Sequence, residues 1–179
     1  MTDSQKGSMW SLIIVVAATI LAVIVVGINY PGNEKREITP TSVPIPPINQ
    51  ALIGEYQGTL LAGVSAPLLD FNQTDYDQAR QSGKLVVLYF YANWCPICRA
   101  EFPVMQKVFN GLTTDQVVGF RVNFKDNETE AKETELAREF GVAYQHTKVF
   151  IKNGERVLKS PEGWDENRYL SEIGRFLNQ

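Results

Sequence analysis

Cysteine and histidine are scarce in this chain, since its 179 residues include two cysteines and one histidine. A structural zinc site takes four Cys or His ligands, so one copy of the chain cannot build such a site from these residues alone. Two cysteines also exclude a small fold that is held together by several disulfides.

An excess of basic charge is absent as well. Lys and Arg number 17 against 20 Asp and Glu, which gives a net charge of −3. Proteins that bind nucleic acid normally present a basic face, so we expect no nucleic-acid partner. Phosphate-binding glycine loops are missing too, since Gly83-Lys84 lacks the upstream glycine and the following Ser or Thr. We expect no cofactor.

A long uncharged stretch lies near the N-terminus. Residues 12–28 carry no charge, and Trp10 and Tyr30 flank them as aromatic residues flank membrane spans. At about 1.5 Å per residue, a helix over residues 10–30 crosses a hydrocarbon layer of about 30 Å. We predict a single transmembrane anchor in the lipid bilayer over residues 10–30, after a tail of residues 1–9.

The flanking segments favour an uncleaved anchor. The apolar run is longer than that of a signal peptide, and no A-x-A cleavage site follows it. Lys6 and the N-terminal amine precede the helix, whereas the charges of residues 34–37 sum to zero. The positive-inside rule then predicts a single-pass protein of the cell membrane with its soluble domain on the extracytoplasmic side.

Proline is concentrated after this stretch, since five of the nine prolines lie in residues 31–47. Such a segment cannot form a helix and tends to be extended. We predict a proline-rich linker over residues 31–64. Within it the pattern of residues 48–64 is ambiguous, and a short strand around residues 56–61 is the one element it suggests.

Residues 65–179 show the hydrophobic patterns of an α/β domain. Residues 84–91 form a continuous apolar, β-rich run, which is typical of a strand covered on both faces. Asn153-Gly154 predicts a hairpin. The order of elements predicts a mixed sheet flanked by helices, with parallel crossovers first and the hairpin after them. The expected helices cover residues 74–82, 95–111, 129–140 and 165–177, and the expected strands residues 84–91, 117–124, 148–151 and 156–158.

Both cysteines lie in one C-x-x-C motif, Cys95 to Cys98, directly after the apolar strand and at the start of a helix. The N-terminus of a helix stabilises a thiolate on Cys95. Cys98 follows one turn later, within disulfide reach. This pattern favours reversible thiol–disulfide exchange; half of a zinc site and two structural thiols are the alternatives.

Residues 65–178 resemble a thioredoxin-fold domain. The segment LVVLYFYANWCPIC is similar to the strand and active-site turn of thioredoxins. Pro103 stands where their long helix carries a proline, and KNGERV is similar to their final hairpin. CRAEFP is closer to the membrane-anchored, outward-facing TlpA-like proteins. The resemblance implies a thiol–disulfide oxidoreductase in which Cys95 attacks and Cys98 resolves. It also implies protein thiol or disulfide substrates. The redox direction does not follow from the sequence, although a reductase is favoured. In an oxidising compartment a reductase needs an electron source, for which we expect a membrane redox partner.

Three positions depart from the thioredoxin pattern. Many thioredoxins carry a buried acid where this chain has Tyr89, and Glu101, which occurs in the TlpA-like group, can take over its role as proton acceptor for Cys98 through a water. The alternative for Glu101 is a solvated helix residue. Arg121 stands where a lysine often pairs with that acid. Because the acid is absent from this chain, we expect the side chain of Arg121 to be exposed. His146 aligns with the cis-proline that faces the C-x-x-C motif.

A cis bond before a residue other than proline costs about 2.5–4 kcal/mol, so we expect the Gln145–His146 bond to be trans. At this position the imidazole can stabilise the Cys95 thiolate, act as acid or base, or bind a metal with both sulfurs; the alternative is an exposed loop histidine. The candidate catalytic residues are therefore Cys95, Cys98, Glu101 and His146.

Two other functions stay open beside the oxidoreductase. A chaperone for Cu or Zn would bind the metal through Cys95, Cys98 and His146, because paired thiolates and imidazole suit these ions. Copper-delivery proteins of the same fold, however, use a wider cysteine spacing. A scaffold that only binds partners is the third reading, and the intact C-x-x-C motif disfavours it.

Overall fold

The computed structural model describes residues 56–178. The predicted tail, the predicted anchor at residues 10–30 and most of the predicted linker lie outside this part, and so these boundaries stay predictions. Within residues 56–178, no helix combines the length and the apolar character that crossing a membrane requires.

A six-stranded mixed sheet forms the centre of the domain, in the order β1-β2-β4-β3-β5-β6. β3 pairs in parallel with β4 and antiparallel with β5, and β5 continues into the β6 hairpin. The predicted α/β mixed sheet is thus confirmed. The strands are β1 Leu60–Ala62, β2 Leu68–Asp70, β3 Leu85–Tyr91, β4 Val117–Asn123, β5 Thr147–Lys152 and β6 Glu155–Ser160.

The two strands at one edge show where periodicity fails. β1 overlaps the end of the short strand suggested around residues 56–61, whereas β2 was not predicted at all. Each has three residues, which is too few for an alternating pattern to be recognised. β2 is held in place by parallel pairing with β4, for example Leu69 with Phe120, a contact between distant parts of the chain.

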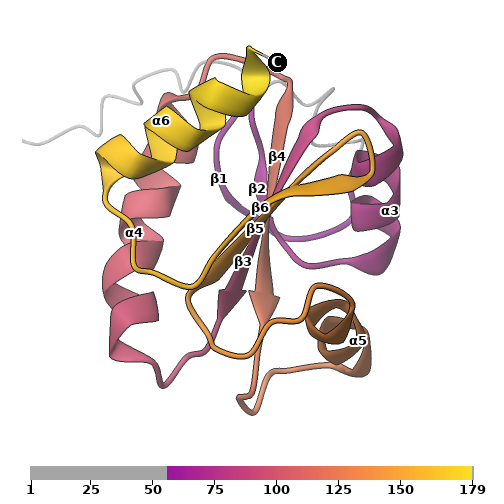
Figure 1. Cartoon of the computed structure of the whole chain (residues 1–179), viewed down its shortest axis with the longest axis vertical. Coiled ribbons are helices and arrows are strands. Elements are labelled where there is room, and N and C mark those ends of the chain that lie inside the picture. The colour runs from indigo at the N-terminus through magenta and orange to yellow at the C-terminus, as the bar shows by residue number, and fades with distance from the viewer. Residues whose placement is uncertain (1–55, 179) are drawn as a thin grey trace, which may run out of the picture. The chain divides into compact units, whose positions relative to one another are not determined.

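Helices cover both faces of the sheet, α4 and α6 on one side and α3 and α5 on the other (Figure 1). All four predicted helices are present, with ends within two residues of those expected. Their bounds are α3 Gln73–Gln81, α4 Pro96–Gly111, α5 Ala131–Glu139 and α6 Glu166–Leu177.

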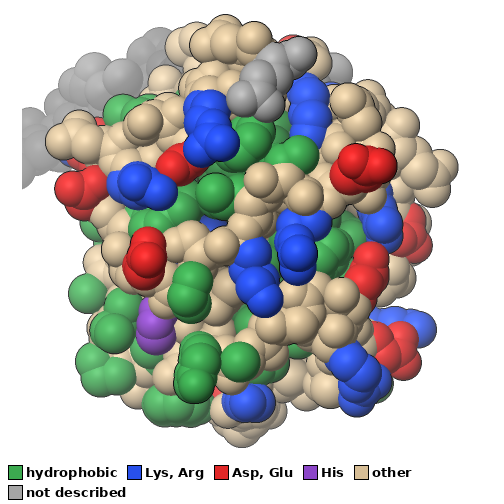
Figure 2. Space-filling view, in the orientation of Figure 1, with side chains coloured by type: hydrophobic (Ala, Val, Ile, Leu, Met, Phe, Trp, Pro, Cys, Tyr) green, Lys and Arg blue, Asp and Glu red, His purple; other side chains and the backbone are tan. Residues whose placement is uncertain are grey.

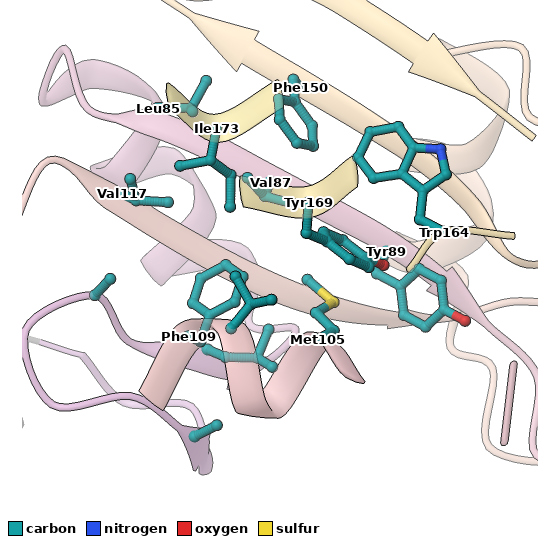
Figure 3. Close-up of a cluster of buried hydrophobic side chains, with 14 of the residues drawn as sticks. Leu85, Val87, Tyr89, Met105, Phe109, Val117, Phe150, Trp164, Tyr169 and Ile173 are labelled. Atoms are coloured by element: carbon teal, nitrogen blue, oxygen red, sulfur yellow. The ribbon is translucent and has the colours of Figure 1, made fainter. Parts of the chain in front are cut away.

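The side chains of β3 alternate between two hydrophobic cores. Leu85, Val87 and Tyr89 point to the core beneath α4 and α6, where they pack with residues such as Met105 and Phe150 (Figure 3). The intervening residues of β3 belong to the second core, beneath α3 and α5. Since residues 85–90 are all buried, β3 is a rigid support for the C-x-x-C turn that follows it.

Candidate active site

The two cysteines lie at the N-terminus of α4, as the strand–turn–helix pattern predicts. Cys95 is the N-cap residue, and its Sγ accepts a hydrogen bond from the backbone N–H of Cys98 at 3.2 Å. Both are free thiols. A sulfur that accepts a backbone N–H at a helix N-terminus is in an environment that stabilises negative charge.

Neither thiol is open to solvent. Cys95 is 2% exposed and Cys98 is 0% exposed, so the two differ little in accessibility. Burial raises the pKa of the Cys98 thiol to about 11, and its hydrogen bond with Cys95 adds to the rise. At neutral pH Cys98 is therefore a protonated thiol.

His146 lies beside the first cysteine, with Nδ1 3.8 Å from Sγ of Cys95. No peptide bond in residues 56–178 is cis, so the bond before His146 is trans, as expected. The backbone of His146 is in the left-handed region with φ of 54°, and its N–H donates to the carbonyl of Phe90 at 2.7 Å. A proline could not replace it without change, because proline has no N–H and its φ is fixed near −65°.

The protonation of His146 is disfavoured. Its pKa is lowered from the ordinary value by burial first and by the charge of Lys148 second, while Glu101 acts in the opposite direction. The imidazole is therefore neutral at pH 7 and presents a lone pair on one of its ring nitrogens.

Glu101 lies in the interior and not on a solvated helix face, since it is 4% exposed. Its Oε1 forms an ion pair with Nζ of Lys148 at 2.7 Å and accepts the backbone N–H of Trp164 at 3.0 Å. The hydroxyl of Tyr169 donates to the same oxygen at 2.8 Å. The carboxylate is thus held by a cation from β5 and by donors from α6 and the loop before α6.

Tyr89 connects this carboxylate to the second cysteine. Its hydroxyl donates to Oε2 of Glu101 at 3.3 Å, and its interaction with the Cys98 thiol offsets part of the rise in the pKa of that thiol. A water between Glu101 and Cys98 stays a prediction, and the Tyr89 hydroxyl, which contacts the carboxylate and interacts with the thiol, is a second route between them. Burial, followed by the charge of Glu101, raises the pKa of Tyr89.

Lys148 is the site residue that the sequence analysis missed. It is 0% exposed, and besides Glu101 its Nζ contacts two backbone carbonyls, that of His146 at 2.9 Å and that of Glu162. A signal was available, because alternation along β5 puts Lys148 on the same face as the buried Phe150. Burial lowers the pKa of Lys148, and the Glu101 carboxylate opposes that change.

Arg121 corrects another expectation, because its side chain is only 22% exposed. It forms an ion pair with Asp70 at 2.7 Å, and its guanidinium lies over the rings of Tyr91 and Phe102, 5.4 Å from each centroid. With no buried acid beside it, Arg121 pairs with β2 and packs on aromatic rings instead of turning to solvent.

Hydrophobic side chains are exposed near the motif. Trp94 and Ile97, which flank the cysteines, are 53% and 49% exposed, and Tyr144, two residues before His146, is 65% exposed. Figure 2 shows the histidine among hydrophobic side chains on one face of the domain. Such a surface suits contact with a polypeptide.

The sequence profile of the thioredoxin family matches residues 67–175. This chain belongs to the thioredoxin family. It is 41% identical to Thioredoxin H4 of Arabidopsis thaliana over 83 residues, which are 46% of this chain and 64% of that protein. It is 31% identical to the thioredoxin of Malassezia sympodialis over 87 residues, 47% of this chain and 77% of that one.

A solved structure agrees with this assignment. A mutant thioredoxin from Halobacterium salinarum NRC-1 superposes with a TM-score of 0.50 at 26% identity, over 64% of this chain and 93% of that one. The match to Thioredoxin H4 covers slightly less than two thirds of that protein. The residues that match the family profile include β3 and α4, between which the C-x-x-C motif begins.

Proposed function

We propose that this protein is a membrane-anchored, extracytoplasmic thiol–disulfide oxidoreductase of the TlpA-like type, which reduces disulfides in protein substrates. The observation that carries the proposal is the pair of thiols at the N-terminus of α4, with the Cys95 sulfur stabilised by the Cys98 N–H at 3.2 Å. Membership of the thioredoxin family supports it.

Reduction of a substrate disulfide proceeds in two displacements. The Cys95 thiolate attacks one substrate sulfur, which forms a mixed disulfide and releases the other substrate sulfur as a thiolate that takes up a proton. The Cys98 thiol then loses its proton and attacks Cys95, which forms the Cys95–Cys98 disulfide and releases the second substrate thiol. Two electrons pass from the protein to the substrate.

The second step needs a proton acceptor, because burial keeps Cys98 protonated at neutral pH. Glu101 can fill this role through Tyr89, whose hydroxyl donates to the carboxylate and whose interaction with the Cys98 thiol affects the pKa of that thiol. Tyr89 would pass one proton to Glu101 and receive one from Cys98, so that it stays a neutral phenol. Lys148 compensates the charge of the carboxylate between turnovers.

The anchor and the outward orientation rest on the sequence. Residues 10–30 have the length and the flanking aromatics of a membrane span, and the charge bias favours an external domain. A reductase in an oxidising compartment needs an electron source, for which a membrane redox partner is the natural candidate.

Trapping tests the chemistry most simply. We expect the reduced full chain to reduce insulin disulfides, and Cys98→Ser to accumulate a mixed disulfide with insulin through Cys95. Cys95→Ser is the matched control and should trap nothing. Trapping by Cys95→Ser instead would reverse the two roles, and trapping by neither variant would contradict the proposal.

Topology needs its own test. A reporter enzyme that is active only after export, fused after Gln179, should be active. Activity of a reporter that works only in the cytoplasm would contradict the extracytoplasmic location and leave the chemistry of the cysteines untouched.

A further inference from the structure

The geometry points to a second use of the same residues: we propose that the reduced protein binds one thiophilic d¹⁰ cation, Zn²⁺ or Cu⁺, through Sγ of Cys95, Sγ of Cys98 and Nδ1 of His146. Substrate disulfides then displace the ion by oxidising its two sulfur ligands. The binding step goes beyond the proposed function, and only the release step rests on it.

The three ligand atoms are already gathered. They lie within 4.8 Å of one another, and within residues 56–178 they form the one group of three or more Cys, His, Asp or Glu side chains with metal-ligand spacing. Around a tetrahedral zinc, ligand atoms lie about 3.5–3.8 Å apart. The sulfur of Cys95 and Nδ1 of His146 are 3.8 Å apart, so this pair has the required separation without rearrangement.

The chemistry of the ligands fits these ions. Two thiolates and one imidazole satisfy a three-coordinate Cu⁺, or a Zn²⁺ that keeps its fourth position for water or a partner's side chain. Two thiolates also cancel the charge of Zn²⁺, which lowers the cost of placing the ion beside buried residues. His146 is the half-buried ligand of the three, so its side is the entrance.

The histidine is held in place from behind. Its N–H donates to the Phe90 carbonyl at 2.7 Å, and its own carbonyl accepts from Nζ of Lys148 at 2.9 Å. Lys148 is in turn paired with Glu101 on α4, the helix that carries Cys98. The imidazole and the thiols are therefore fixed to one rigid framework, as supporting contacts fix the ligands in known metal sites.

Metal binding and the disulfide exclude each other. The metal-bound dithiolate, one substrate disulfide and two protons give the Cys95–Cys98 disulfide, two substrate thiols and one free cation. The two electrons come from the two thiolates and go to the substrate disulfide. The protein therefore holds the ion only while it is reduced and releases one ion for each disulfide formed.

The test titrates the reduced full chain with Co²⁺, a spectroscopic substitute for Zn²⁺ whose thiolate charge-transfer band reports the number of bound sulfurs. In two separate experiments, Zn²⁺ or Cu⁺ buffered by a competing chelator is then added to displace the bound Co²⁺. His146→Asn removes the imidazole but keeps a residue that tolerates positive φ. Tyr144→Ala, an exposed neighbour in the same loop, is the matched control.

We expect two bound thiolates in the wild type, the same in Tyr144→Ala, and no binding by the oxidised protein. Affinity should be weaker by at least about 100-fold in His146→Asn, because losing a ligand costs more than the 10- to 100-fold that losing a ligand's supporting contact costs. Displacement by Cu⁺ alone or by Zn²⁺ alone identifies the ion that the site prefers. Equal affinity of His146→Asn and wild type, or no binding by the reduced wild type, would overturn the three-ligand site.

Disulfide exchange measured in excess chelator separates the two proposals. If the protein exchanges disulfides but binds no metal, the metal site is wrong and the proposed function stands. If the protein binds metal but exchanges no disulfides, the proposed function and the release step are wrong and the metal site stands.

Discussion

Two buried glutamates on opposite faces of the sheet differ in what holds them. Glu133, in α5, is 3% exposed, and within residues 56–178 its partners are backbone N–H groups alone, those of Asn123 at 2.7 Å and Glu130 at 2.8 Å. Glu101, in α4, is 4% exposed and accepts from the side chains of Lys148, Tyr89 and Tyr169 as well as from one backbone N–H.

The difference separates a carboxylate with a structural role from one whose surroundings can change with the redox state of the cysteines. Glu133 completes a capping box and fixes the start of α5. Its partners are backbone N–H groups, which do not change their protonation state. Partners such as lysine and tyrosine are themselves titratable, and Tyr89 also contacts Cys98. The surroundings of Glu101 can therefore depend on the redox state of the cysteines, whereas those of Glu133 cannot.

The largest expected effect comes from removing the cation of the buried pair. Lys148→Met leaves the Glu101 carboxylate uncompensated in the interior and should lower the free energy of unfolding by about 3–5 kcal/mol. Urea unfolding of the reduced chain, followed by tryptophan fluorescence, measures it.

The double variant Glu101→Met/Lys148→Met removes both charges of the buried pair, so that neither is left uncompensated. It should recover most of the stability lost in Lys148→Met while resolving mixed disulfides more slowly than wild type. A double variant as unstable as the single one would show that the pair does not act as a unit.

The next effect concerns pH. Because its pKa is raised from 9.0 to about 11 by burial, Cys98 is protonated up to a higher pH than an ordinary thiol. Its alkylation rate should therefore rise about tenfold per pH unit and level off only near pH 11, which mass spectrometry of the labelled peptides can follow. A plateau for Cys98 near pH 9 would contradict the assigned environment.

The smallest effect is expected on the other face. Glu133→Gln replaces one carboxylate oxygen by an amide nitrogen, which leaves the N–H of Asn123 or of Glu130 without its acceptor. The cost should be about 1–2 kcal/mol in the same urea experiment. The pH profile of Cys98 alkylation should stay unchanged, and a shift in that profile would show that the two faces are not independent.

Local patterns in the sequence predicted the parts of the molecule that depend on neighbouring residues. The C-x-x-C turn follows from an apolar strand that runs directly into a helix, and the β5–β6 hairpin follows from Asn153-Gly154. Pairings across the fold were not accessible in this way. Lys148 meets Glu101 from 47 positions away, and Arg121 finds Asp70 only because β2 pairs with β4.

The equilibrium reduction potential of the Cys95–Cys98 pair, measured on the full chain against thiol buffers of known potential, decides whether this protein is a reductant. We expect a single two-electron couple with a potential of about −270 mV, the value of a thioredoxin-like reductant. A potential of about −120 mV, the value of a strong oxidant, or no disulfide between Cys95 and Cys98 at any potential, would contradict it.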